Sequence, residues 1–331
     1  MINLGSPDST SVKDVKTYLD EFLMDGRVIE YNYFLRWLLV KGIILNTRPK
    51  KSAEAYKKIW WKEGSPLIVL SKKLFNKVQK KTDIPVSLAM RYGSISIKKG
   101  ISELVEKGVT EVIVLPLYPH YAMSSYETVV EKVKSECKSL FPDLKKTIIP
   151  PFYDNAEYID LMVSNIKKNI KGIKYDHILF SYHGIPESHI KISDITKNHC
   201  LKVDDCCNTN SPAHSKCYRH QVFTTTELIV KKLGVRDDKY SNAFQSRLPL
   251  QPWLKPYTDK TLEKLPKEGK KNILLICPGF ASDCVETLEE ISIEGKKSFM
   301  EAGGENFDFI PCLNDSEEHI DLFSHLVNRY V

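Results

Sequence analysis

Apolar and polar residues follow two alternating periodicities along the chain. Short apolar runs predict buried strands at residues 84–90, 111–117, 147–149, 177–182, 271–276 and 307–311. Stretches with apolar positions at helical spacing predict helices at residues 12–23, 53–59, 97–107, 126–140, 156–171, 224–232 and 285–302. Continuously apolar strands that alternate with helices predict an α/β protein, in which parallel sheets are flanked by helices on both faces.

The alternation forms two similar halves, which predicts two domains. We place the first at residues 1–153 and the second at residues 154–315, although no flexible linker marks the junction. The helical stretch 316–331 is expected to pack back on the first domain. Residues 1–7 have the pattern of a strand end that runs into a turn, so we expect a few apolar residues before Met1 in the natural protein.

The composition is typical of a soluble globular protein, with 42% apolar and 27% charged residues. The net charge of +6 comes from basic residues scattered among acidic ones, which argues against a nucleic-acid-binding protein. No apolar run reaches the length of a membrane span, and the N-terminus lacks the layout of a signal peptide. We therefore expect a cytoplasmic protein, in which clustered cysteines indicate metal binding or catalysis before disulfides.

Polar side chains follow several predicted strands directly. Arg91 follows residues 84–90, and His183 follows residues 177–182. Ligands of open parallel sheets bind at the carboxyl ends of the strands, so these residues indicate a site. A histidine in this place is usually structural, and the motif alone does not specify a reaction.

An acidic stripe follows the predicted strand 271–276. Asp283 is placed to cap a helix, and Glu286, Glu290 and Glu294 follow at a spacing that puts them on one helical face. Such a stripe is by itself usually a solvated surface.

Six motifs change this interpretation. They are Asn-Leu-Gly-Ser-Pro at 3–7, Gly-Ser-Pro-Leu at 64–67, Ser-Tyr-His-Gly-Ile-Pro at 181–186, Phe-Gln-Ser-Arg at 244–247, Trp-Leu-Lys-Pro-Tyr-Thr-Asp at 253–259 and Pro-Gly-Phe-Ala-Ser-Asp-Cys-Val-Glu-Thr-Leu at 278–288. In this order, from residue 2 to about residue 315, the chain resembles the ferrochelatases. The resemblance implies two Rossmann-like domains of the chelatase fold with a porphyrin cleft between them. It implies the last step of haem biosynthesis, insertion of Fe²⁺ into protoporphyrin IX with release of two protons.

The resemblance also assigns residues to the reaction. His183 and Glu286 match the catalytic pair of the family, with the histidine acting as base or as metal ligand. Together with Glu290 and Glu294 they match the path of the substrate iron. Cys284 is a departure, because the family often has a second histidine there. It fills space or contacts metal, and we favour the first.

Residues that match the porphyrin pocket are spread over the chain. Ser65, Tyr56 and Arg91 match partners of the propionates, since a hydroxyl or a guanidinium suits an anion. Candidates for the apolar walls, for which core packing is an equal alternative, are Leu4, Tyr118, Tyr121 and Trp253.

Residues 31–45 form a strongly apolar segment that is too short to span a bilayer. It is either a buried core helix or an amphipathic lip at the pocket mouth. Since ferrochelatases have such a lip, we expect peripheral membrane contact through 31–45, and we expect a monomer or weak homodimer.

Four of the eight cysteines lie within the polar segment 199–219, at Cys200, Cys206, Cys207 and Cys217. Four thiolates suit Zn²⁺ or an iron–sulfur cluster, and an insert without metal is the remaining alternative. Some microbial ferrochelatases carry a 2Fe–2S cluster on such a segment, so we expect that cluster as a structural or sensing cofactor.

Other functions stay open at this point. Coproporphyrin III is the alternative substrate. A cobalt chelatase of cobalamin synthesis shares the fold, but it does not as a rule share the 244–247 and 253–259 motifs. A non-catalytic haem- or iron-responsive protein has no need of both His183 and Glu286.

Overall fold

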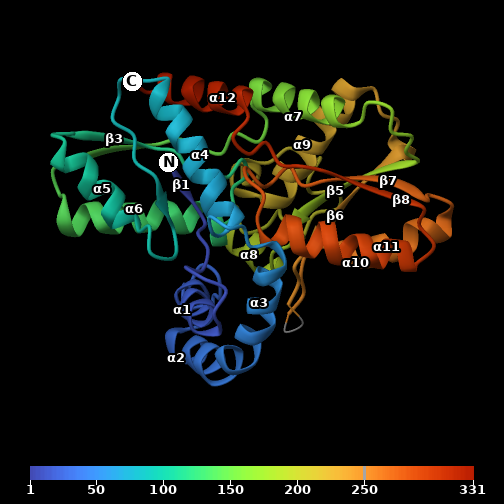
Figure 1. Cartoon of the computed structure of the whole chain (residues 1–331), viewed down its shortest axis with the longest axis horizontal. Coiled ribbons are helices and arrows are strands. Elements are labelled where there is room, and N and C mark those ends of the chain that lie inside the picture. The colour runs from blue at the N-terminus through green and yellow to red at the C-terminus, as the bar shows by residue number, and fades with distance from the viewer. Residues whose placement is uncertain (249–250) are drawn as a thin grey trace. The chain divides into compact units, whose positions relative to one another are not determined.

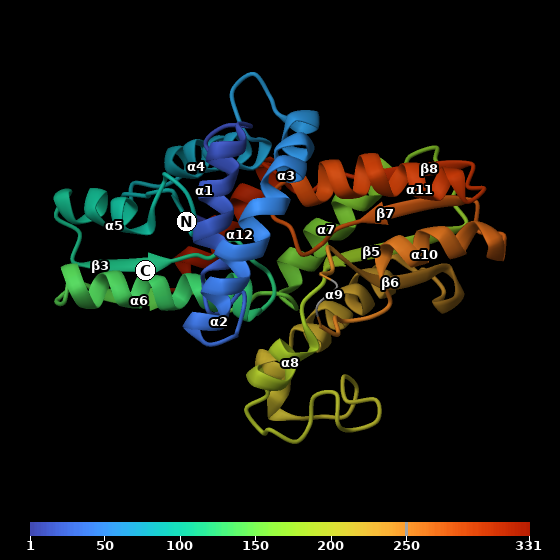
Figure 2. The same ribbon diagram turned by 90° about the horizontal axis from the view of Figure 1, so that it is seen from below.

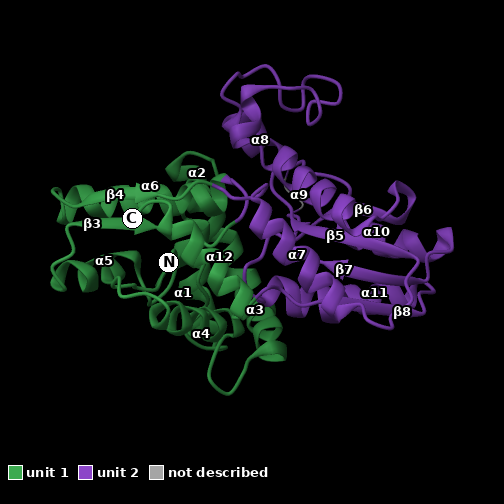
Figure 3. Ribbon diagram, turned by 90° about the horizontal axis from the view of Figure 1, so that it is seen from above, with its two compact units in different colours: residues 1–118, 123–150, 314–331 green, residues 119–122, 151–313 purple. Residues whose placement is uncertain are grey.

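The computed structural model describes residues 1–248 and 251–331, which form two compact units (Figure 3). Unit 1 consists of residues 1–118, 123–150 and 314–331, and unit 2 consists of residues 119–122 and 151–313. Each unit has parallel strands and helices that pack on them, so the predicted α/β class is confirmed. Residues 249–250, between the motifs at 244–247 and 253–259, lie outside the described residues.

Unit 1 contains four short parallel strands. Strand β1 pairs with β2 and β3 pairs with β4, while a bridge from Ile2 to Pro116 joins the two pairs. Its elements are β1 Ile2–Asn3, α1 Val12–Leu23, α2 Tyr33–Trp37, η1 Leu38–Ile44, α3 Leu45–Ile59, α4 Pro66–Lys80, β2 Ala89–Met90, α5 Ile97–Glu106, β3 Glu111–Val114, η2 Met123–Glu127, α6 Thr128–Leu140, β4 Lys145–Ile148 and α12 Glu317–Asn328.

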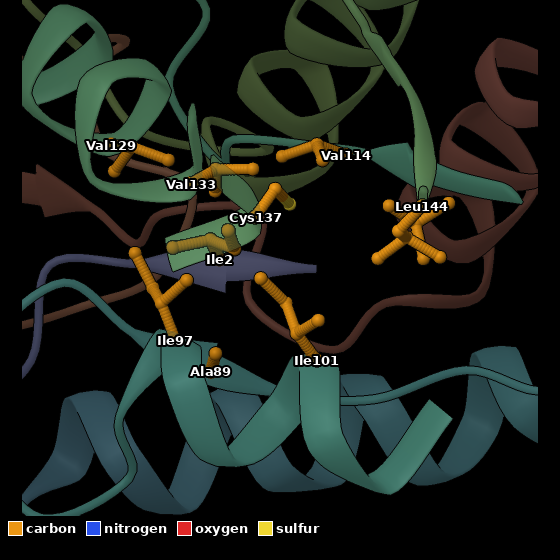
Figure 4. Packing of buried hydrophobic residues seen from close by; sticks show 10 residues of the cluster. Ile2, Ala89, Ile97, Ile101, Val114, Val129, Val133, Cys137 and Leu144 are labelled. Atoms are coloured by element: carbon orange, nitrogen blue, oxygen red, sulfur yellow. The ribbon is translucent and has the colours of Figure 1, made fainter. Parts of the chain in front are cut away.

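The core of unit 1 lies between these strands and helices α5 and α6 (Figure 4). Helix α6 contributes Val129, Val133 and Cys137, which are four residues apart and so share one face. Helix α5 contributes Ile97 and Ile101 at the same spacing. Both helices were predicted from this spacing.

Unit 2 contains a four-stranded parallel sheet in the order β6-β5-β7-β8 (Figure 1). Its elements are α7 Ala156–Asn169, β5 His177–His183, α8 Glu187–Ser193, η3 Pro212–Lys216, α9 Tyr218–Leu233, η4 Asp237–Lys239, β6 Tyr240–Gln245, α10 Thr258–Lys264, η5 Leu265–Glu268, β7 Asn272–Ile276, η6 Glu286–Gly295, α11 Lys296–Glu301 and β8 Asn306–Ile310.

Helices cover both faces of this sheet, as neighbouring side chains of β5 demonstrate. Ser181 bonds to Thr258 of α10 at 2.8 Å, whereas Tyr182 bonds to Thr226 of α9 at 2.8 Å. Successive residues of a strand point to opposite faces, so α10 and α9 lie on opposite sides. A strand between two apolar layers must be apolar throughout, which explains the run that predicted β5.

Several predicted elements differ from the structure. The strand predicted at 84–90 is reduced to β2, and β6 and α4 were not predicted. The helix predicted at 285–302 begins as a π-helix, η6, and continues as α11. The Ser292 hydroxyl donates to the Thr287 carbonyl at 2.9 Å. π-Helices such as η6 are rare and often lie at functional sites.

Candidate functional site

The carboxyl ends of β5 and β6 meet at one edge of the sheet of unit 2. His183 is the last residue of β5 and pairs in register with Gln245, the last residue of β6. Gly184 follows, and a Cβ atom there would lie 2.7 Å from the Gln245 carbonyl oxygen, so only glycine fits this approach. The close approach of the Gly184 and Gln245 backbones therefore fixes the end of β5 and the position of His183. The His183 residue is half-buried there.

The ring of His183 is held in one tautomer. Its Nδ1 lies 2.6 Å from the Gly184 carbonyl oxygen, which only accepts hydrogen bonds, so Nδ1 carries the proton. In neutral His183 the Nε2 lone pair is then available to take a proton or bind a metal. The Tyr218 hydroxyl donates to the His183 carbonyl at 2.9 Å, and the Trp253 ring lies 6.5 Å from the His183 ring.

The acidic stripe lies on η6, where Glu286, Glu290 and Glu294 are half-buried. A π-helix turns more widely than an α-helix, and residues four apart are still nearly one turn apart. The predicted common face is therefore kept, although the helix type was wrong.

Two residues at the end of β6 hold this helix. The Gln245 side-chain amide donates to the Glu286 carbonyl at 3.0 Å. The Ser246 backbone N–H donates to Glu290 Oε1 at 2.7 Å, and its hydroxyl donates to Glu290 Oε2. Neither role was predicted from the sequence. The Phe-Gln-Ser-Arg motif was the only signal.

Burial raises the pKa of the Glu290 carboxyl. The bonds from Ser246 and the charge of His183 oppose this rise, whereas the charge of Glu286 adds to it. His183, Glu286 and Glu290 thus form one electrostatic group in unit 2.

Asp283 and Cys284 precede the acidic helix, and both are buried. The Thr287 hydroxyl donates to Asp283 Oδ1 at 2.9 Å, and the Cys312 N–H reaches the same oxygen at 3.4 Å. Asp283 therefore connects the start of the helix with the loop after β8.

Burial and the nearby Glu286 carboxylate raise the pKa of the Cys284 thiol well above its usual value. A neutral thiol is a poor metal ligand, which favours the space-filling interpretation of Cys284.

Ser65 and Tyr56 lie in unit 1. A turn closed by two hydrogen bonds of 3.0 Å between Trp61 and Gly64 leads to Ser65, the N-cap of the 15-residue helix α4. The Ser65 side chain makes no capping hydrogen bond, so the N–H groups of the first turn are not capped by it. Tyr56 is buried on α3, with its ring 6.0 Å from that of Trp60.

Arg91 is part of a buried network in unit 1. It pairs with Asp25, which also accepts hydrogen bonds from Thr128 and, at 3.0 Å, from the Tyr92 hydroxyl. Arg91 Nε donates to the Thr128 hydroxyl at 2.7 Å. A propionate at Arg91 would have to compete with Asp25.

The remaining wall candidates lie in both units. Leu4 is half-buried after β1, and Tyr118 packs against the core of unit 1. Tyr121 is buried in unit 2, where its N–H donates to the Gln221 side chain at 2.7 Å.

The cysteine insert extends from α8 and α9 of unit 2 (Figure 2). All four cysteines are buried. A hydrogen bond from Cys207 lowers the pKa of Cys217 to about 6, and Cys200 is a further partner of Cys217. The Leu201 N–H lies 3.4 Å from Cys206 Sγ, and Arg219 Nη1 lies 3.4 Å from Cys207 Sγ.

Three histidines bond to the backbone of the adjacent Cys206 and Cys207. His199 and His214 donate through Nε2 to the Cys206 carbonyl at 2.7 and 2.9 Å, and His220 donates through Nδ1 to the Cys207 carbonyl at 2.7 Å. Within residues 1–248 and 251–331, no group of three or more His, Cys, Asp or Glu side chains is arranged to hold a metal ion.

The segment 31–45 forms α2, η1 and the first residue of α3. Seven of its large apolar side chains are exposed, namely Tyr31, Tyr33, Phe34, Leu35, Trp37, Leu38 and Ile43. The interpretation as a buried core helix is therefore wrong for these positions, whereas Val40 and Leu45 are buried. Among the described residues, none of the helices combines the length and the apolar character needed to cross a membrane.

Comparison with known proteins gives the same family over the whole chain. A family model described as Ferrochelatase matches residues 1–331. A protein named Ferrochelatase from Opitutus terrae is 49% identical over 334 residues, which cover 100% of this chain and 96% of that protein. Another protein of that name, from Pseudomonas fluorescens, is 45% identical over 331 residues, covering 99% of this chain and 96% of its own length.

The fold has similar solved structures. A structure of SirB from Bacillus subtilis with Fe³⁺ superimposes with a TM-score of 0.55 at 12% identity, over 80% of this chain and 91% of that chain. This similarity shows the chelatase fold alone.

Proposed function

We propose that this chain, which belongs to the ferrochelatase family, inserts ferrous iron into protoporphyrin IX at His183 and Glu286. Ferrochelatases are lyase-type metal chelatases, and this insertion is the terminal step of haem biosynthesis. The observation that carries this proposal is the free Nε2 of His183 beside the acidic helix η6. The test is anaerobic incubation with Fe²⁺ and protoporphyrin IX, followed by the absorption of haem.

Metal insertion requires the loss of two pyrrole protons from the macrocycle. With Nδ1 bonded to Gly184, His183 takes a pyrrole proton at Nε2. The Gln245 side-chain amide holds the backbone of Glu286. The Glu286 carboxylate stabilises the resulting imidazolium and accepts the second proton. In the alternative role, His183 and Glu286 bind the incoming iron as ligands.

Iron reaches this pair along Glu294, Glu290 and Glu286. Carboxylates bind divalent cations through oxygen and exchange protons readily. The nearly aligned spacing on η6 gives successive contacts rather than one closed site, so iron is passed on and released. Cys284 stays a neutral thiol and takes no part.

Residues of unit 1 bind the porphyrin in this proposal. Ser65 at the N-terminus of α4 suits a propionate, because the first-turn N–H groups and the helix dipole favour an anion. Tyr56 is the second candidate, and Leu4 and Tyr118 supply apolar contacts. Arg91 would bind a propionate only in competition with Asp25, which already pairs with its guanidinium.

Cys200, Cys206, Cys207 and Cys217 would hold the 2Fe–2S cluster. Four buried cysteine side chains, with the Leu201 N–H close to Cys206 Sγ and the Arg219 guanidinium close to Cys207 Sγ, supply the sulfur donors that such clusters use. When bound, the cluster would cross-link the insert and make it responsive to iron supply or redox state.

Replacing Cys206 with serine should abolish the visible absorption of the purified protein, because the cluster loses one thiolate ligand. The Cys137→Ser variant, on α6 of unit 1, is the matched control and should keep the absorption. Unchanged spectra and unchanged thermal unfolding in Cys206→Ser would rule out the cluster.

The exposed side chains of α2 and η1 would rest in the membrane interface. Tyr33 and Phe34 are 68% and 67% exposed, so the apolar surface of this segment is open to a membrane interface. Its basic residues already have partners, because Lys41 pairs with Asp20 and Arg36 donates to backbone carbonyls. Such contact would bring a poorly soluble porphyrin to the enzyme.

Replacing both Phe34 and Leu38 with glutamate should reduce binding to vesicles of phosphatidylethanolamine and phosphatidylglycerol at least about tenfold in a sedimentation assay, because each change removes inserted apolar surface and adds negative charge. The fold should be unaffected, since both side chains are exposed. The control is Val12→Glu on α1, an exposed apolar residue outside the segment. Equal binding of the double variant and the control would contradict the membrane contact.

A further inference from the structure

Ser246 is the residue that connects the end of β6 with the acidic helix. Two donors from this one residue reach the two oxygens of one carboxylate: its N–H lies 2.7 Å from Glu290 Oε1, and its hydroxyl bonds to Oε2. Both bonds are charge-assisted, which makes them stronger than bonds between neutral groups.

The backbone of Ser246 is adapted to this contact. Its φ of 65° lies in the left-handed region, which a residue with a side chain seldom adopts. Strain of this kind persists where the surrounding structure holds it, and it is concentrated at functional sites. Gln245, immediately before it, is held by the Ser181 hydroxyl at 2.8 Å and itself holds the Glu286 carbonyl.

We propose that Ser246 is a positioning residue for iron transfer, which holds both oxygens of Glu290 and so prevents this carboxylate from closing on iron as a two-oxygen ligand. The inference rests on the proposed role of Glu290 in the iron path. Two donors from one residue that reach both oxygens occupy the lone pairs that face a common partner, and a two-oxygen metal ligand needs those same lone pairs. The lone pair left on each oxygen points away from the other oxygen. Iron is then bound through a single oxygen, weakly enough to move on toward Glu286 and His183.

Removal of the hydroxyl should change iron kinetics in a characteristic way. In Ser246→Ala, Glu290 Oε2 loses its donor and binds iron more tightly, so kcat for iron insertion should fall about tenfold, the size expected for one charge-assisted bond. The KM for Fe²⁺ should fall as well, while the KM for the porphyrin should stay unchanged. A merely structural role would instead raise the KM for Fe²⁺ or affect both substrates.

Two further variants separate the hydrogen bond from other effects. Ser246→Gly also lacks the hydroxyl but relieves the left-handed backbone, so it should show the same kinetics even if Ser246→Ala folds poorly. Ser292→Ala removes a hydroxyl from the same helix that bonds only to the Thr287 carbonyl, and it should leave both KM values and kcat unchanged.

The decisive experiment is a double-mutant cycle with Glu290→Ala on the full cluster-loaded chain. If Ser246 acts through Glu290, Ser246→Ala should have no further effect on kcat in the Glu290→Ala background. An equal loss in both backgrounds would overturn the positioning role. If Glu290→Ala itself leaves the kinetics of Fe²⁺ unchanged, the iron path along η6 is wrong instead, and the two failures are thus distinguished.

Discussion

Replacement of His183 with alanine should lower kcat for iron insertion by a factor on the order of 10³, in the range expected for loss of a general base. Nδ1 of His183 is committed to the Gly184 carbonyl, so Nε2 is the atom that meets a pyrrole proton or the iron. Since the side chain lies at the sheet edge and not in the core of unit 2, binding of the porphyrin should be largely kept. Anaerobic steady-state rates with Fe²⁺ and fluorescence titration with the porphyrin measure the two quantities.

His177 offers a matched control at the opposite end of the same strand. It is buried at the start of β5, where its Nε2 bonds to the Ser241 hydroxyl at 2.8 Å. His177→Gln should therefore reduce thermal stability and leave kcat close to that of the unmodified chain. A His183→Ala variant whose kcat equals that of His177→Gln would remove His183 from the chemistry.

Replacement of Glu286 with glutamine should lower kcat by a factor on the order of 10², because the change keeps the size of the side chain but removes its negative charge. In the proposed mechanism the change removes the partner of the His183 imidazolium and the last carboxylate of the iron path. The effect should fall on kcat more than on the KM of the porphyrin.

Glu289→Gln is the control for this change, since Glu289 lies on the same π-helix and outside the stripe. Its iron kinetics should match those of the unmodified chain. If Glu289→Gln and Glu286→Gln lose activity equally, the overall charge of the helix matters and not the position of Glu286.

The strands of unit 2 illustrate what a sequence pattern does and does not determine. β5 and β7 were predicted because each is a largely apolar run between two helical layers. β8 was predicted from Phe307, Phe309 and Ile310, although Asp308 interrupts them. β6, with the sequence Tyr-Ser-Asn-Ala-Phe-Gln, has a polar first half, since it is an edge strand with β5 as its single partner in the sheet. Its structure depends on pairing with β5, which local sequence does not encode.

Helix type was equally hidden. The apolar spacing of 285–302 suits an α-helix and a π-helix almost equally, because the two differ by one residue in each turn. Two further π-helices were not predicted either, namely η1 in the segment 31–45 and η2 directly before α6. In each case the pattern indicated a helix and left its hydrogen bonding undetermined.

The candidate residues His183, Glu286 and Glu290 were found because motif order identified the family. The residues that hold them were not, since Gln245 and Ser246 act through hydrogen bonds across 41 and 44 positions of the chain. Arg91 demonstrates the opposite limit. An arginine suits a propionate, but the actual partner of Arg91 is Asp25, which lies 66 positions away. No local sequence pattern predicts this ion pair.

The most direct test of the central claim is anaerobic incubation of the purified full chain with Fe²⁺ and either protoporphyrin IX or coproporphyrin III, with haem formation followed by absorption. We predict that haem forms, that protoporphyrin IX is converted faster, and that His183→Ala lowers the rate with both porphyrins by a factor on the order of 10³. Absence of haem, together with ready insertion of Co²⁺ into a corrin precursor, would contradict the account.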